Sequence, residues 1–65
     1  MRRVLIVDDD PRVRAALTAL IAATTDLTLT GAAGTARDAC TALATRPVDL
    51  ILIDVQLPTA TMASP

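Results

Sequence analysis

Acidic side chains follow two hydrophobic stretches of this 65-residue sequence. Three aspartates, residues 8–10, come directly after the apolar run 4–7, and Asp54 comes directly after the apolar run 50–53. If the two runs are neighbouring parallel strands, their carboxyl ends lie at one edge of a sheet, where open α/β proteins place their binding crevices. Crowded carboxylates repel one another unless a cation lies between them, and Mg2+ prefers oxygen ligands of this kind. The spacing therefore predicts an acidic, metal-dependent site.

Asp10 has a different predicted role, because Pro11 follows it. An acid before a proline is typical of a helix that begins with an N-cap side chain and carries proline at its first position. Apolar residues then recur at helical spacing, and the predicted helix covers residues 11–23. Its apolar stripe consists of Val13, Ala16, Leu17, Leu20 and Ile21. We expect this stripe to face a core, with Arg12 and Arg14 on a solvated face.

Three strands are predicted along the chain. Residues 3–7 form a continuous apolar strand, which is typical of a parallel sheet covered on both faces. Residues 27–30 alternate between leucine and threonine, which predicts a half-exposed strand at a sheet edge that ends near Gly31. A third strand is expected at residues 49–53.

A second helix is predicted between these strands. Thr35 and Asp38 have the spacing of a capping box, and Pro47 stops the helix because its ring cannot continue helical geometry. The predicted apolar stripe consists of Ala36, Ala39, Cys40 and Leu43. On this stripe Cys40 is expected to be a buried small hydrophobe.

The element order is strand, helix, strand, helix, strand. Two right-handed crossovers of this length predict a parallel three-stranded sheet in the order 2-1-3, with one helix on each face. The third strand, residues 50–53, then forms an open apolar edge, and such edges recruit other chains. We expect the 65-residue chain alone to be largely unfolded, aggregated or strand-swapped, with self-association through this third strand.

The composition excludes several kinds of function. The chain contains six arginines and seven aspartates but no lysine, histidine or glutamate, giving a formal net charge of -1. Because it has no basic stripe, we expect no direct nucleic-acid binding by this segment. Without histidine there is no Ser-His-Asp triad, and without lysine there is neither a Schiff-base nucleophile nor a phosphate-loop lysine. The sequence has no aromatic residue to stack on bases.

The same sequence indicates a compartment. The apolar run after the basic start, residues 4–7, is too short for a secretory signal, and no segment reaches the roughly 18 apolar residues of a membrane span. The lone Cys40 cannot form an internal disulfide. We therefore expect a cytoplasmic chain that does not contact a membrane.

Two motifs together resemble a known family. The run from Val4 through Asp9, combined with Asp54 to Pro58 after a third hydrophobic strand, is similar to the receiver domain of two-component response regulators. The resemblance implies an α/β, flavodoxin-like parallel sheet, truncated to strand-helix-strand-helix-strand. Residues 1–58 would be the N-terminal part of a receiver, and residues 59–65 a loop or frayed tail. The stretches 26–31 and 46–50 further resemble regulators with a LuxR/NarL-type helix-turn-helix output.

The resemblance also implies roles for individual residues. Asp54 would be the phosphoacceptor, and Mg2+ would be held by Asp8, Asp9, Asp54 and the backbone carbonyl of Gln56. The phosphoryl group would come from a sensor histidine kinase, and an output domain absent from this segment would regulate transcription. Such a module is a signalling domain rather than an enzyme.

The chain departs from the family pattern after Pro58. Receivers normally continue to a strand that ends in threonine or serine and a strand that ends in lysine, and Met62 stands where many carry glycine. Two alternatives therefore stay open. One is a truncated receiver fragment without activity. The other is an aspartyl-nucleophile phosphohydrolase, although such enzymes place a second acid two residues after the nucleophile and this chain has Gln56.

Overall fold

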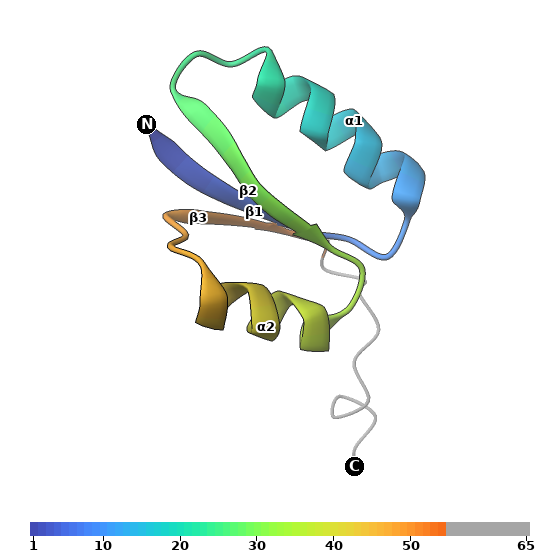
Figure 1. Cartoon of the computed structure of the whole chain (residues 1–65). Coiled ribbons are helices and arrows are strands. Elements are labelled where there is room, and N and C mark those ends of the chain that lie inside the picture. Colours follow the sequence, from blue (N-terminus) through green and yellow to red (C-terminus); the bar gives the residue numbers. More distant parts are fainter. Residues whose placement is uncertain (55–65) are drawn as a thin grey trace.

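The structure, a computed structural model, describes residues 1–54 and contains three strands and two helices within them. The elements are β1 (Arg2–Val7), α1 (Pro11–Ala22), β2 (Leu27–Ala33), α2 (Ala36–Thr45) and β3 (Leu50–Ile53). β1 lies at the centre of a parallel sheet with the order β2-β1-β3, and the two helices cover opposite faces of it (Figure 1). The predicted fold class, the element order and the strand order 2-1-3 are therefore confirmed. The predicted boundary between a domain and a tail at residues 58 and 59 lies outside the described residues.

The core is built on both faces of β1. Residues 4–7 are buried, and alternate side chains point to opposite faces because successive residues of a strand alternate in direction. On one face they pack against Ile21 of α1. On the other face they pack against Ala33 and Ala39, from β2 and α2. This two-sided burial explains why the central strand is a continuous apolar run rather than an alternating one.

Helix α1 begins where predicted but is rotated relative to the predicted stripe. The side chain of Asp10 accepts a hydrogen bond from the backbone N–H of Arg12 and caps the helix. The covered row consists of Arg14, Leu17, Thr18 and Ile21, whereas Val13 and Leu20 are 39% and 61% exposed. The expectation that Arg14 lies on a solvated face is therefore wrong. The apolar pattern alone did not fix the rotation, because α1 packs on the narrow strip formed by β1 and β2.

Helix α2 packs through its smallest side chains. The side chain of Thr35 accepts a hydrogen bond from the backbone N–H of Asp38, as its capping position predicts. The inward residues are Ala36, Ala39 and Ala42. Cys40 is exposed, so its predicted burial is wrong, because this alanine row and not the Cys40 side of the helix faces the sheet. Within residues 1–54, neither helix is long and apolar enough to cross a membrane.

Strand β2 is an edge strand, as predicted, but it continues to Ala33 instead of ending near Gly31. Its pairing with β1 shifts at Thr30, whose carbonyl accepts a hydrogen bond from the side chain of Arg46. The shift reverses the alternation, so that Leu29 packs on the α1 face while Ala33 packs on the α2 face. Small residues have weak strand propensity, which hid this extension in the sequence.

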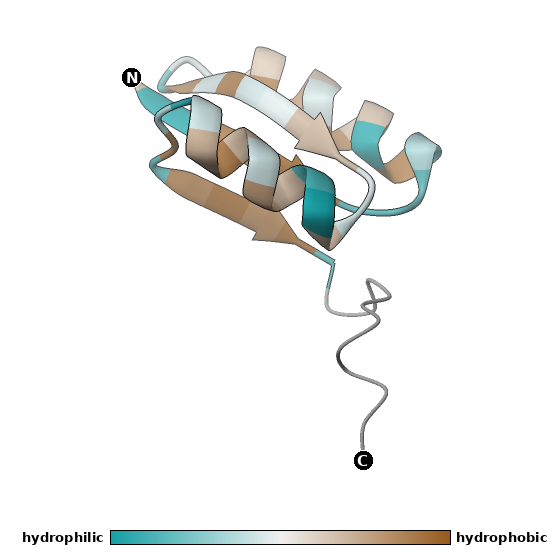
Figure 2. Ribbon diagram, turned by 60° about the horizontal axis from the view of Figure 1, so that its bottom comes forward, coloured by the Kyte–Doolittle hydropathy of each residue, from teal (hydrophilic) through white to brown (hydrophobic). Residues whose placement is uncertain are grey.

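Strand β3 is only partly covered: Leu52 packs against the core cluster of Val4, Ile6 and Ile21, and the other three residues are exposed. The helix backbones approach β1 and β2 but, within residues 1–54, neither approaches β3. Leu50, Ile51 and Ile53 are 41%, 36% and 59% exposed. Figure 2 shows β3 as an uninterrupted hydrophobic strand at the margin of the molecule. In the described part of the chain, β3 is therefore the open apolar edge that the sequence predicts.

Candidate functional site

Three of the predicted acidic residues converge at the carboxyl edge of the sheet. Asp8 follows β1 and Asp54 follows β3, and carboxylate oxygens of Asp8, Asp9 and Asp54 lie within 4.8 Å of one another. The backbone continues the sheet pairing into the site, because the N–H of Asp54 donates to the carbonyl of Val7 at 2.9 Å. The parallel register of β1 and β3 thus brings together residues that are more than forty positions apart in the sequence.

Asp8 is the fixed member of this cluster, and only 7% of it is exposed. Its N–H donates to the carbonyl of Ala33 at 2.9 Å, and its Oδ1 accepts from the N–H of Asp10 at 2.9 Å. Its own carbonyl accepts from Nη1 of Arg14 at 2.7 Å. Hydrogen bonds to the N–H, the side chain and the carbonyl leave Asp8 little freedom to turn.

The other two acids of the cluster are more accessible to solvent than Asp8. Asp9 is exposed and Asp54 is partly buried. Neither Asp8 nor Asp9 forms a salt bridge with any residue in the range 1–54. The cluster is therefore accessible to solvent on the side of Asp9.

Asp10 stands apart from the cluster. Its carboxylate accepts from the backbone N–H of Arg12 at 2.9 Å and forms a salt bridge with the Arg12 guanidinium at 3.3 Å. The side-chain hydrogen bond from Arg12, followed by the backbone hydrogen bond from the same residue, lowers the pKa of Asp10 below its ordinary value of 3.8. Asp10 thus has the capping role that the sequence predicts.

The donor set fits a hard divalent cation. It consists of carboxylate oxygens from three residues with no cysteine or histidine among them, which is the ligand type of Mg2+. A cation between these oxygens offsets their mutual repulsion, which is otherwise costly at a largely buried position such as Asp8. The predicted fourth ligand, the carbonyl of Gln56, lies outside the described residues.

Arg14 is a further neighbour of this site that was not predicted from the sequence. Nη1 of Arg14 reaches back from α1 to the end of β1, where it contacts the backbone of Asp8. The available signal was the spacing: Arg14 is four residues after the N-cap Asp10, one turn into a helix that begins beside the acids.

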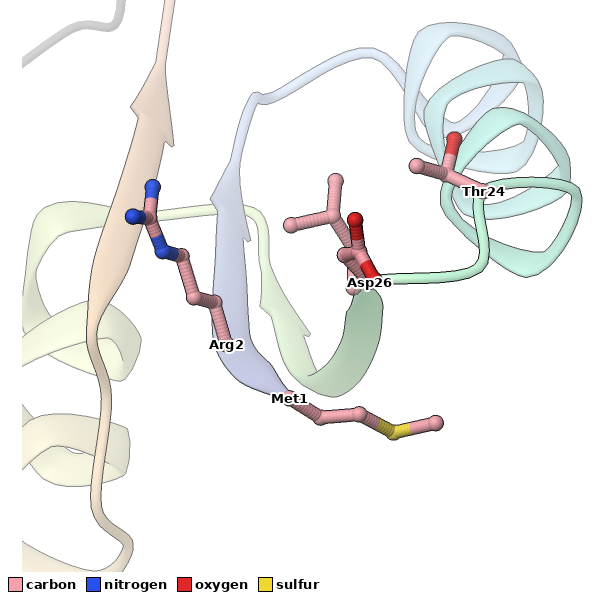
Figure 3. A pocket seen from close by; sticks show the side chains of 5 residues that line it. Met1, Arg2, Thr24 and Asp26 are labelled. Carbon is pink, nitrogen blue, oxygen red and sulfur yellow. The ribbon is translucent and has the colours of Figure 1, made fainter.

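A second surface feature lies far from the acids. A shallow hollow at the amino end of the sheet is lined by Met1, Arg2, Thr24, Asp26 and Leu27. Figure 3 shows the side chains of Met1 and Arg2 pointing to different sides of the chain. Because this hollow gathers no cluster of ligating groups, the acidic edge is the candidate functional site.

The fold and the site together define a class of protein. They describe an open, parallel α/β protein whose acidic residues lie at the carboxyl ends of a central strand and its neighbour. Residues 4–62 match the family model of the response regulator receiver domain, and the chain therefore belongs to that family. This match confirms the family resemblance that the sequence predicted. Receivers are signalling modules of two-component systems. No curated protein and no solved structure matched the chain.

Proposed function

We propose that this chain is a phosphoacceptor module in which Asp54 accepts the phosphoryl group and Asp8, Asp9 and Asp54 hold Mg2+. The observation that carries the proposal is the convergence of the three carboxylates within 4.8 Å at the carboxyl edge of the sheet. Membership of the receiver family supports it independently. The backbone carbonyl of Gln56 is the proposed further ligand.

The proposed reaction is an in-line phosphoryl transfer. An oxygen of the Asp54 carboxylate forms a bond to phosphorus while the bond from phosphorus to the donor breaks, and the product is an acyl phosphate. Bound Mg2+ supplies positive charge that offsets the carboxylates and the phosphoryl oxygens. Asp8 provides a fixed, largely buried carboxylate, and Asp9 provides a solvent-facing one.

The proposed donor and output follow from the family. The phosphoryl group comes from the phosphohistidine of a sensor histidine kinase, whose imidazole nitrogen is the leaving atom. The response is regulation of transcription in the cytoplasm through an output domain, and this segment does not itself bind nucleic acid. The even balance of arginine and aspartate supports that last point. The proposed role is that of a signalling domain rather than an enzyme.

Acetyl phosphate tests the proposal without a kinase. With Mg2+ present, we expect the intact mass to increase by one phosphoryl group and the modified peptide to contain Asp54. Labelling should be slow, because the 65 residues contain no lysine to offset the charge of the transferring group.

Two variants sharpen the experiment. Asp54→Asn keeps the size of the side chain but removes the nucleophilic oxygen, and it should abolish labelling. Asp38→Asn removes an exposed carboxylate of α2 and should leave labelling unchanged. Stable labelling of a residue other than Asp54, or full labelling of the Asp54→Asn chain, would refute the assignment.

A further inference from the structure

Arg14 is a polar residue in a position where α1 covers the sheet. It belongs to the half-buried row that it forms with Leu17 and Thr18, and its Nη1 donates to the carbonyl oxygen of Asp8 at 2.7 Å. A guanidinium on a backbone carbonyl forms a charge-assisted hydrogen bond, which is stronger than a bond between neutral groups. The bond ties the first turn of α1 to the end of β1, at the origin of the acidic cluster.

This bond acts on the peptide that joins Asp8 to Asp9. The N–H and the side chain of Asp8 are already held, by Ala33 and Asp10. Because a peptide unit is planar, holding the Asp8 carbonyl also fixes the direction of the Asp9 N–H and the position of the Asp9 Cα, from which the side chain extends. Asp9 is exposed and its side chain forms no salt bridge within residues 1–54, so the backbone at its Cα is the constraint that this bond adds.

Gly34 leaves the space in which the guanidinium lies. A Cβ at position 34 would lie 3.0 Å from Nη1 of Arg14 and 3.9 Å from the carbonyl oxygen of Asp8. A methyl group there would require the guanidinium to move by a few tenths of an ångström, since 3.0 Å is shorter than an ordinary van der Waals contact. The turn between β2 and α2 thus forms one wall of the Arg14 site.

We propose that Arg14, in the space left by Gly34, is a positioning residue of the metal site: it holds the Asp8 carbonyl and thereby aims Asp9 at the cation. This inference rests on the proposed Mg2+ site and goes beyond it by assigning two residues that supply no ligand. Groups that orient metal ligands typically change affinity by about 10-fold or more when they are removed.

The direction in which Mg2+ affinity changes when Arg14 is removed distinguishes a positioning role from a purely electrostatic role. Arg14 carries a positive charge next to a cation site, and a positive charge that acts only by repulsion weakens cation binding. Removal of such a charge would tighten Mg2+ binding. Removal of a positioning residue weakens it instead, although the same positive charge has been lost.

The test is a Mg2+ titration of the full 65-residue chain, followed through the backbone amide signals of Asp9 and Asp54 in the folded protein. Signals of folded molecules report affinity independently of the fraction that is unfolded. We expect Arg14→Ala to weaken Mg2+ binding about 10-fold. Arg14→Lys, which keeps the charge and one donor group, should recover part of that loss. Arg12→Ala is the matched control, because Arg12 lies on the same helix with a 90% exposed side chain.

Gly34→Ala tests the second half of the proposal and serves if Arg14→Ala does not fold. It should weaken Mg2+ binding less than Arg14→Ala, and the double variant should bind no more weakly than Arg14→Ala, because the added methyl group then displaces nothing. Unchanged or tighter binding in Arg14→Ala, or additive losses in the double variant, would overturn the inference. If the unmodified chain neither binds Mg2+ nor labels on Asp54, the proposed function fails instead.

Discussion

At the scale of single residues, the acidic cluster predicts that Mg2+ stabilises the folded chain. Mg2+ that binds the folded chain and not the unfolded chain raises the free energy of unfolding, by about 2.7 kcal/mol at a concentration 100 times the Kd. We expect the far-ultraviolet circular dichroism signal to shift toward that of the folded chain as Mg2+ is added, because Mg2+ binding increases the folded fraction. In Asp9→Ala and Asp54→Ala this shift should shrink, because each variant removes one ligand of the proposed site. Equal shifts in the unmodified chain and both variants would eliminate the site.

The lowered pKa of Asp10 predicts how the stability of the folded chain depends on pH. Arg12 lowers the pKa of Asp10 in the folded chain below the 3.8 of an ordinary aspartate. The folded state therefore binds fewer protons than the unfolded state between these two values, and the stability that Asp10 contributes is complete above about 3.8 and is lost as the pH falls through the lowered pKa.

The variant Asp10→Asn isolates this contribution. Asparagine still caps a helix, but it does not titrate and carries no negative charge to form an ion pair with the Arg12 guanidinium. The decrease in the free energy of unfolding below pH 3.8 should be smaller in Asp10→Asn than in the unmodified chain, as measured by urea denaturation at several pH values. A steeper decrease in the variant would contradict the lowered pKa.

The sequence predicted the acidic residues of the site but not the hydrogen bond from Arg14 that holds the backbone of Asp8. Asp8, Asp9 and Asp54 could be found because each follows an apolar run, and parallel strands bring such positions to one edge. The spacing from the N-cap Asp10 placed Arg14 one turn into α1, but it did not reveal the contact, because the partner of Arg14 is a backbone carbonyl, which has no sequence signature. The side chain of an arginine at a helix surface resembles a solvated charge until the rotation of that helix is known.

At the scale of elements, the helix caps predict measurable stability. The hydroxyl of Thr35 accepts from the backbone N–H of Asp38 at 3.1 Å, and without it that donor at the helix start loses its partner. Thr35→Ala should lower the free energy of unfolding by about 1 kcal/mol. Chemical denaturation followed by circular dichroism measures this loss.

Thr41→Ala provides the control for the cap. The Thr41 hydroxyl donates to the carbonyl of Arg37 within α2, a bond that adds no partner for an unpaired helix end. Alanine also has the higher helix propensity, so this variant should be as stable as the unmodified chain or slightly more stable. If both variants lose the same stability, the cap is not the cause.

The same contrast explains which elements could be predicted. Both helix starts followed from local chemistry, since a cap acts within four residues of itself. The rotation of α1 depends instead on the width of the sheet beneath it, and Val13 and Leu20 are exposed because α1 lies over β1 and β2 alone. The extension of β2 to Ala33 depends on pairing with the distant residue Val7. These features are non-local, so hydrophobic spacing did not determine them.

At the scale of the whole molecule, the two helices cover only part of the sheet. Both helices lie over β1 and β2, and β3 contributes Leu50, Ile51 and Ile53 to the exposed surface (Figure 2). The strand contains no charge or proline that would prevent another strand from pairing with it. We therefore expect the isolated chain at micromolar concentration to be largely unfolded or associated through β3, rather than a compact monomer.

A pair of variants with matched exposure tests whether β3 is the contact. Ile53 of β3 and Leu20 of α1 are 59% and 61% exposed, so both present similar apolar surface to water. Ile53→Lys adds a charge at the strand edge and should shift the associated chain toward smaller species in size-exclusion chromatography, because edge lysines oppose strand pairing. Leu20→Lys should leave the elution unchanged, since it adds the same charge away from the edge. Equal shifts in both variants would indicate general hydrophobic association. A compact unmodified monomer with a cooperative thermal transition would show that the exposed strand β3 needs no partner.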